Sequence, residues 1–131
     1  MNLLRLGYMT DNKNYIEKAG HSLELFSNDL NRLPFSSPQM LCALSFMLYS
    51  PKEIILTGDL GNLKTKDLIK CIDETFIPNK VLLHATKELE KISPFIINLI
   101  KDSQEINVYA CENYQCNLPT NDTEKLKELL Q

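Results

Sequence analysis

The sequence predicts an α/β fold in which an N-terminal αα-hairpin packs with a small three-stranded parallel βαβαβα unit. Apolar residues recur at helical spacing before residue 50, whereas short apolar runs rich in β-branched residues recur after it, separated by further helical segments. The chain has 131 residues, 44% hydrophobic and 24% charged, which is typical of a single packed unit. We expect the hairpin in residues 1–50 and the α/β unit in residues 51–131.

Two stretches of helical spacing predict the hairpin. Across residues 12–30, apolar side chains follow one another at intervals of three and four, and Asp11 stands at the N-cap position. Residues 36–38 then supply a capping hydroxyl and a first-turn proline for a second helix that ends near Tyr49. Because such a pair buries only one face of each helix, we expect the other faces to need partners.

Three short apolar runs predict the strands. Residues 53–57 and 80–84 are typical of buried strands, and residues 106–111 alternate more, as a half-exposed strand does. Strands that alternate with helices favour a parallel sheet with right-handed crossovers. The helices are expected in residues 68–76, in residues 89–100 with a restart at Pro94, and after Asp122.

The ends of these strands carry the candidate site residues. Asp59 follows the first strand, His84 ends the second and Cys111 ends the third. Because parallel strands bring their carboxyl ends to one edge of a sheet, we expect these side chains to meet there, where they would suit acid–base or thiol chemistry. The same residues also allow a plainer interpretation, in which Asp59 forms a turn, His84 lies on the surface and Cys111 is buried packing.

Cysteine number and spacing bear on compartment and chemistry. Four cysteines are too few for a secreted disulfide scaffold, so we expect a cytoplasmic protein, with Cys42 and Cys71 packed in the core. Four residues separate Cys111 from Cys116, which suits neither a C-x-x-C redox motif nor a zinc site. We expect two unpaired thiols, with a disulfide as the open alternative if the Cα atoms lie within about 7 Å. We expect neither a metal nor a cofactor.

Charge and hydropathy argue against two classes of partner. The net charge is −3 and no two basic residues are adjacent, which disfavours binding to the phosphates of nucleic acids. The longest apolar stretch, residues 40–49, is about half the length needed to span a bilayer. We therefore expect no nucleic-acid partner and no membrane partner.

One C-terminal segment resembles the tail of a known family. Residues 108–122 read V-Y-A-C-E-N-Y-Q-C-N-L-P-T-N-D, which resembles the motif Y-V-C-x-x-x-x-C-x-x-P-x-x-D of the spermatogenesis-associated, thioredoxin-domain-containing proteins, whose bacterial members are called YyaL-like. Residues 52–59 and 76–83 are similar to the same region of that family, and residues 2–6 and 37–41 resemble the helices that precede it. The sequence departs from the family at His84, where the family usually has an aliphatic residue.

The resemblance implies a larger parent protein. Its members carry an N-terminal thioredoxin-like domain and then an α/α toroid similar to N-acylglucosamine 2-epimerases and six-hairpin glycosidases. The resemblance therefore implies that the hairpin is the end of a toroid and that the chain is a C-terminal fragment. The parent resembles carbohydrate-active enzymes, whereas we do not expect the fragment itself to be one.

Two functions are expected from this combination. In the first, the chain is a non-catalytic structural cap of the toroid, partnered by the rest of that toroid or by self-association through exposed helical faces. In the second, Cys111 and Cys116 form a thiol-redox site, or a site for a small sugar-like or anionic ligand at the strand ends, together with Asp59 and His84.

Overall fold

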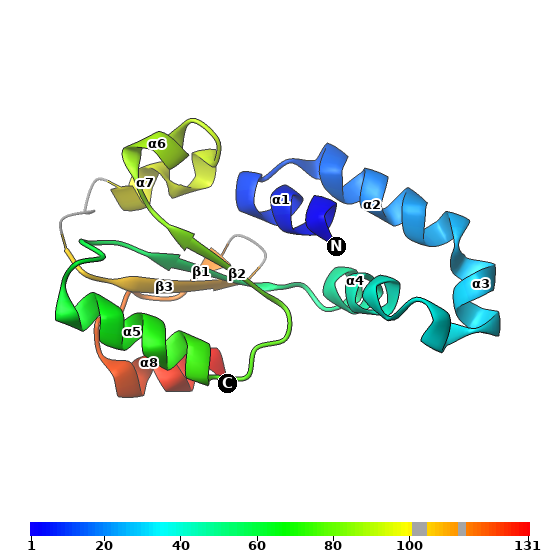
Figure 1. Cartoon of the computed structure of the whole chain (residues 1–131). Coiled ribbons are helices and arrows are strands. Elements are labelled where there is room, and N and C mark those ends of the chain that lie inside the picture. The colour runs from blue at the N-terminus through cyan, green and yellow to red at the C-terminus, as the bar shows by residue number, and fades with distance from the viewer. Residues whose placement is uncertain (101–104, 113–114) are drawn as a thin grey trace.

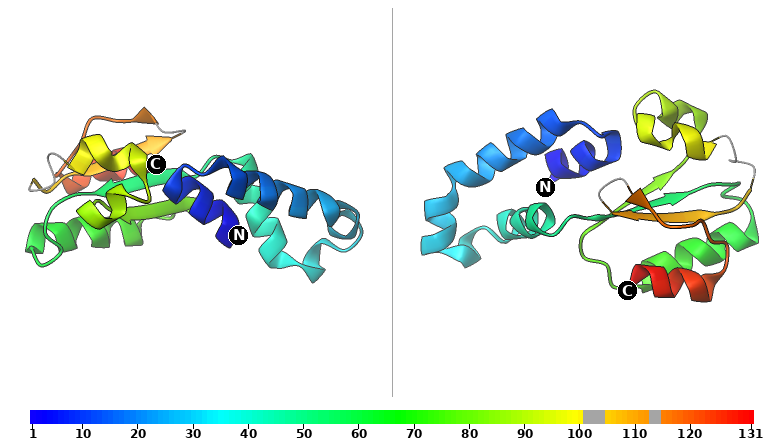
Figure 2. Two further views of the ribbon diagram at one scale, coloured as in Figure 1. Left: turned by 90° about the horizontal axis from the view of Figure 1, so that it is seen from above. Right: turned by 180° about the vertical axis from the view of Figure 1, so that it is seen from behind.

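The computed structural model describes residues 1–100, 105–112 and 115–131 and has a mixed α/β fold (Figure 1). Residues 2–48, which we call the helical arm, extend to one side of the sheet and its covering helices (Figures 1 and 2). The chain first runs toward the sheet over residues 2–10, then outward along the arm over residues 13–32, and returns toward the sheet over residues 38–48. The predicted hairpin is therefore present as an outgoing and a returning row of helices, with a further helix before them.

The arm contains more helices than the two expected. Its elements are α1 (Asn2–Thr10), α2 (Lys13–Leu25), α3 (Ser27–Arg32), the 3-10 helix η1 (Pro34–Ser36) and α4 (Pro38–Leu48). Helix α1 was expected from the family resemblance of residues 2–6 and not from the apolar spacing, and the helix predicted over residues 12–30 is interrupted at Phe26. The predicted cap is also wrong: the Asn12 side chain accepts the N–H of Asn14 at the start of α2, whereas Asp11 ends α1 in the left-handed conformation.

The core of the arm reaches the sheet. Leu4 of α1 and Phe46 of α4 are fully buried, and the ring of Tyr8 packs edge-on against Phe46 with centroids 5.8 Å apart. Gly7 permits the close approach of α1 to α2, because a Cβ there would lie 2.5 Å from Cγ1 of Ile16. Val81, which lies in the sheet, belongs to the same apolar cluster, so this core joins the arm to the sheet.

The sheet has the strand order β2-β1-β3-β4 within the described residues. Strand β1 (Lys52–Leu56) pairs in parallel with β2 (Lys80–His84) and antiparallel with β3 (Val108–Glu112), which pairs antiparallel with β4 (Gln115–Cys116). The prediction of three parallel strands is therefore wrong for the third strand, and the short β4 was not expected.

The two connections between the strands differ in their helices. Between β1 and β2, the 12 residues of α5 (Leu63–Glu74) rise about 18 Å, which matches the roughly 17 Å of a five-residue strand and returns the chain to the start of the sheet. Among the described residues between β2 and β3, the helices are the short α6 (Lys87–Glu90), η2 (Pro94–Ile96) and α7 (Ile97–Ile100). Strand β3 begins at Val108, opposite Leu56 at the end of β1, and therefore runs in the reverse direction.

Two layers of helices cover the sheet. On one face, Ile54 and Leu56 pack with residues of α5 and of α8 (Thr123–Leu130). On the other face, Ile55 and Tyr109 pack with residues of η2 and with Met9 of α1. The second face is therefore the one on which the arm meets the sheet (Figure 2).

Candidate functional site

The reversed third strand separates the predicted site residues. Asp59 follows the end of β1 and His84 ends β2, so these two remain at one edge of the sheet. Cys111 instead pairs with Glu53, near the start of β1, at the opposite end of the strands. The expected cluster of Asp59, His84 and Cys111 on one edge is therefore wrong.

The edge that holds Asp59 and His84 is occupied by local backbone contacts. An Oδ1 atom of Asp59 accepts the N–H of Gly61 at 2.9 Å, which is a turn contact, and Nε2 of His84 lies 2.8 Å from the carbonyl oxygen of Gly58. Gly58 itself has φ +96°, and a Cβ there would lie 2.7 Å from Cγ1 of Ile106. These contacts support the interpretation of Asp59 as a turn residue, whereas His84 is half-buried and not on the open surface.

Thr57 also belongs to this edge, although the sequence did not single it out. It is fully buried, and its hydroxyl donates to the carbonyl oxygen of Glu105 at 2.7 Å and accepts the N–H of Asn107 at 3.1 Å. It thereby holds the segment that leads into β3 against the end of β1. Its position at the end of an apolar run could have indicated that Thr57 is buried. Its hydrogen-bond partners could not be predicted in the same way, because they lie in a segment distant in sequence.

Cys111 and Cys116 form a disulfide, with their Cα atoms 3.9 Å apart. The expectation of two unpaired thiols is wrong, and the open alternative holds, because β3 and β4 place the two residues directly opposite each other. Cys111 is only 1% exposed, whereas Cys116 lies on the surface. The disulfide therefore joins one cysteine that a partner can reach to one that is enclosed.

The other two cysteines are free and differ from each other. Cys71 is buried among α5, α8 and the sheet, as expected, and its burial raises the pKa of its thiol. Cys42 is exposed on α4, so the prediction that it packs in the core is wrong. Neither thiol lies in the cluster that holds the disulfide.

A buried carboxyl group lies beside the disulfide. Glu53 is fully buried in the central strand, with Val81 of β2 and Cys111 of β3 as its register partners. Tyr8 of α1 is near enough for the charge of Glu53 to act on it, since burial and then this carboxylate raise the pKa of Tyr8. A glutamate at the start of a strand gives no signal of burial in the sequence, because its burial depends on the strands and helices packed around it.

The arm also bears a groove. It has a volume of about 760 Å³ and is lined by residues of α1, α2 and α4, among them Arg5, Leu23 and Met40. The exposed Cys42 lies in its wall. This hollow was not expected from the sequence, because it is made where three helices separated along the chain come together.

The part of the chain that the structure describes lacks two other classes of feature. No three histidine, cysteine, aspartate or glutamate residues there lie close enough to hold a metal ion. None of the helices in the described ranges is long and apolar enough to cross a membrane.

Known proteins match the chain along nearly its whole length. No family model and no solved structure matches it. It is 35% identical over 133 residues to spermatogenesis-associated protein 20 of Homo sapiens and 36% identical over 133 residues to that of Rattus norvegicus, covering 98% of the chain and 17% of each relative. An uncharacterized protein of Caenorhabditis elegans is 26% identical over 129 residues, which cover 98% of the chain and 18% of that protein.

These matches confirm part of the expected resemblance. The chain spans only 17% of the length of the two mammalian relatives, so most of each relative lies outside the matched region. The thioredoxin-like domain and the toroid stay predictions. What the comparisons establish is that the chain is similar, over 98% of its length, to one segment of spermatogenesis-associated protein 20.

Proposed function

We propose that the chain is a non-catalytic module whose helical arm packs against a larger helical body, such as the predicted toroid, and closes it as a structural cap. The observation that carries this proposal is the chemistry of α4. No charged residue occurs between Arg32 and Lys52, yet only Ala43 and Phe46 of α4 are buried. A helix that is uncharged on every side normally lies in a protein interior.

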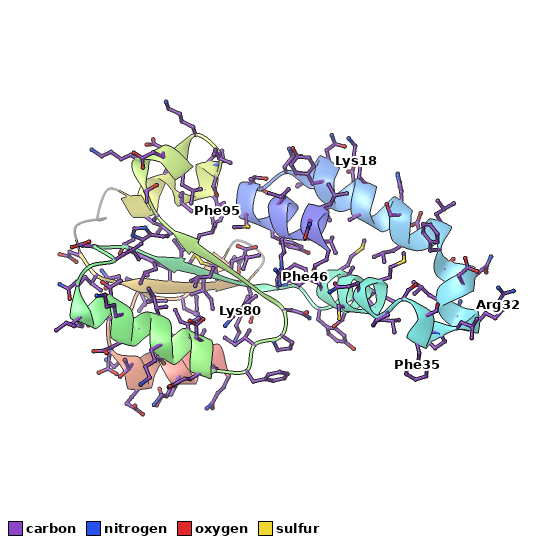
Figure 3. All side chains as sticks on the ribbon, viewed as in Figure 1. Lys18, Arg32, Phe35, Phe46, Lys80 and Phe95 are labelled. Atoms are coloured by element: carbon purple, nitrogen blue, oxygen red, sulfur yellow. A yellow bond between two sulfur atoms is a disulfide. The ribbon has the colours of Figure 1, made fainter. Side chains whose placement is uncertain are left out.

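The surface of the arm supports the same conclusion. Large apolar side chains are exposed at both ends of the uncharged stretch: Phe35 is 93% exposed and Leu48 is 68% exposed. Phe35 projects outward at the far end of the arm (Figure 3). Because removing apolar surface from water gains about 25 cal/mol per Å², such side chains favour a covered state.

The relatives indicate what could cover the arm. Their matched segment makes up 17% of their length, so a polypeptide long enough to form a helical body belongs to the same proteins. The two rows of helices in the arm resemble the repeating unit of a ring of helical hairpins, in which each hairpin packs against its neighbours. We therefore assign the arm to the remainder of such a protein and not to a small ligand.

A binding experiment in trans tests this assignment. The human relative with its matched segment deleted is mixed with the present chain, and complex formation is followed by sedimentation velocity. We expect a complex with the wild-type chain and with Phe76→Asp, whose phenylalanine is 90% exposed outside the arm, but not with Phe35→Asp. No complex, or equal loss with both variants, would contradict the proposal, and a discrete dimer of the chain alone would assign the arm to a second copy.

The disulfide favours a second candidate, thiol–disulfide exchange. Cys116 is exposed and can meet a partner sulfur, while Cys111 is enclosed and can complete the exchange within the chain. Titration of thiols with and without reductant tests it: two thiols should appear together on mild reduction. If Cys111 and Cys116 react only after unfolding, the bond is structural. The version with a ligand at the strand ends is not supported, because Asp59 and His84 lie away from both cysteines.

A further inference from the structure

We propose that Glu53 is the proton acceptor for Cys111 when the reduced cysteine pair closes to its disulfide. The inference rests on the second candidate function, thiol–disulfide exchange. It starts from one juxtaposition: Glu53 and Cys111 are direct partners in the antiparallel register of β1 and β3, and they are 0% and 1% exposed.

The register places both side chains on one face of the sheet. Directly opposite residues of an antiparallel pair have Cβ atoms about 4.5–5.5 Å apart, within reach of a glutamate carboxyl group. Glu53 lies on the face that carries Ile55 and Tyr109, and Cys111 packs in that same cluster. The carboxyl group and the thiol are therefore neighbours on the same buried face of the sheet.

One other ionisable group approaches the pair on its own face of the sheet: Tyr8 of α1, which senses the charge of Glu53. Lys52 and Glu112 are the chain neighbours of Glu53 and Cys111, so they lie on the opposite face, where Nζ of Lys52 is 3.9 Å from an oxygen of Glu112 and donates to the carbonyl oxygen of Leu129 in α8. Glu53 is therefore the carboxyl group enclosed beside Cys111.

The exchange has two balanced steps. The Cys116 thiolate attacks a disulfide of a partner, forming a mixed disulfide, and one partner sulfur leaves as a thiolate that takes up a proton. Cys111 then loses its proton to the Glu53 carboxylate and attacks the Cys116 sulfur. The Cys111–Cys116 bond forms, the second partner sulfur leaves as a thiolate, and Glu53 returns its proton to solvent or to that thiolate. The chain loses two electrons and the partner disulfide gains them.

Enclosure explains why the second step needs an acceptor. A thiol is nucleophilic only as its thiolate, and a buried thiol ionises less readily than an exposed one. Without a carboxylate beside it, Cys111 would depend on hydroxide from solvent, which reaches a residue that is 1% exposed only poorly. The resolution step should therefore proceed at pH values where an ordinary thiol, with a pKa of about 8.5, is mostly protonated.

The test uses the full chain, reduced and then mixed with glutathione disulfide, with acid quenching and mass spectrometry to follow the mixed disulfide. Every protein in the test carries Cys42→Ser, because this exposed free thiol would also take up glutathione. In that background Cys111→Ser should accumulate one glutathione on Cys116. In the wild type the mixed disulfide should resolve to the Cys111–Cys116 disulfide. The rate of this resolution should stop falling with pH and become constant below pH 7. Glu53→Gln should slow resolution by about tenfold or more near pH 7, a typical general-base effect, and the difference should shrink toward pH 9.

The outcomes separate the two proposals. If Cys111→Ser gains no glutathione, exchange itself fails and the role of Glu53 falls with it. If it gains glutathione but Glu53→Gln resolves like the wild type, or is slower by a constant factor at every pH, only the proton-acceptor role is overturned. Should Glu53→Gln not fold, the wild-type pH profile decides: a rate that simply follows ionisation of an ordinary thiol overturns the inference.

Discussion

Replacing Phe46 with alanine should detach the arm from the sheet. Phe46 is fully buried, contacts Tyr8 edge-on and belongs to the cluster that includes Val81 of β2. Truncating a buried phenylalanine costs about 3–5 kcal/mol, of which the aromatic pair accounts for about 0.5–1.5 kcal/mol. Since small domains have only about 5–15 kcal/mol of stability, we expect a large fraction of the total to be lost.

Urea unfolding followed by circular dichroism measures this loss. With a slope of about 2 kcal/mol per M, a change of 4 kcal/mol lowers the unfolding midpoint by about 2 M. Phe35→Ala is the matched control, because the same truncation at a side chain that is 93% exposed should change stability by less than about 0.5 kcal/mol. If Phe46→Ala does not fold, Phe46→Leu should fold with a loss below about 1.5 kcal/mol. Similar losses at Phe46 and Phe35 would refute the placement of α4.

Substitutions at three further positions probe the sheet and its connections. Gly58→Ala should lower the free energy of unfolding by about 1–3 kcal/mol, because φ of Gly58 is +96° and the new Cβ would clash with Ile106. An unchanged urea midpoint would contradict this turn geometry. Cys116→Ser should lower the free energy of unfolding by about 2 kcal/mol, the loop-closure entropy expected for a disulfide with a sequence separation of 5. The reduced wild type should unfold at the same urea midpoint as this variant. Asp122 accepts the N–H groups of Lys125 and Glu124 at the start of α8, and these hydrogen bonds lower its pKa. The stabilising effect of its carboxylate is therefore fully present above the pKa of Asp122 in the unfolded chain. It is lost as the pH falls through the lower pKa of the folded state. Asp122→Ala should have a lower Tm than the wild type at pH 7 and should lose less Tm on acidification. Asp122→Asn should keep the helix cap without that pH dependence. Identical profiles of Tm against pH in the wild type and both variants would argue against the capping bonds.

Local patterns predicted most individual elements correctly. The runs at residues 53–57 and 80–84 form β1 and β2, and the helix expected in residues 68–76 is present as α5, because side-chain periodicity acts within one element. Its bounds differ: α5 begins at Leu63, and Phe76 lies beyond its end and is exposed. The helix after Asp122 is also present, with that residue as its cap. The same patterns failed where a neighbour intervenes: α1 has its place because Gly7 lets it lie against α2, which no local spacing reveals.

The candidate site depended on information that is not local. The identities of Cys111 and Cys116, and the possibility of a bond between them, could be stated from the sequence, but the partner strand that brings them together could not. The prediction that Asp59, His84 and Cys111 share an edge depended on the assumption that all strands run in parallel. The antiparallel direction of β3 places Cys111 beside Glu53 instead.

The sequence by itself determined an α/β chain with an uncharged helix, two buried parallel strands and a pair of cysteines near its C-terminus. Only the tertiary structure decided the direction of β3, the burial of Glu53 and the exposure of α4. The physical reason is the range of the interactions. Periodicity and capping act over a few neighbouring residues, whereas strand direction and the burial of a carboxyl group depend on contacts between segments that are more than forty residues apart, such as β1 and β3.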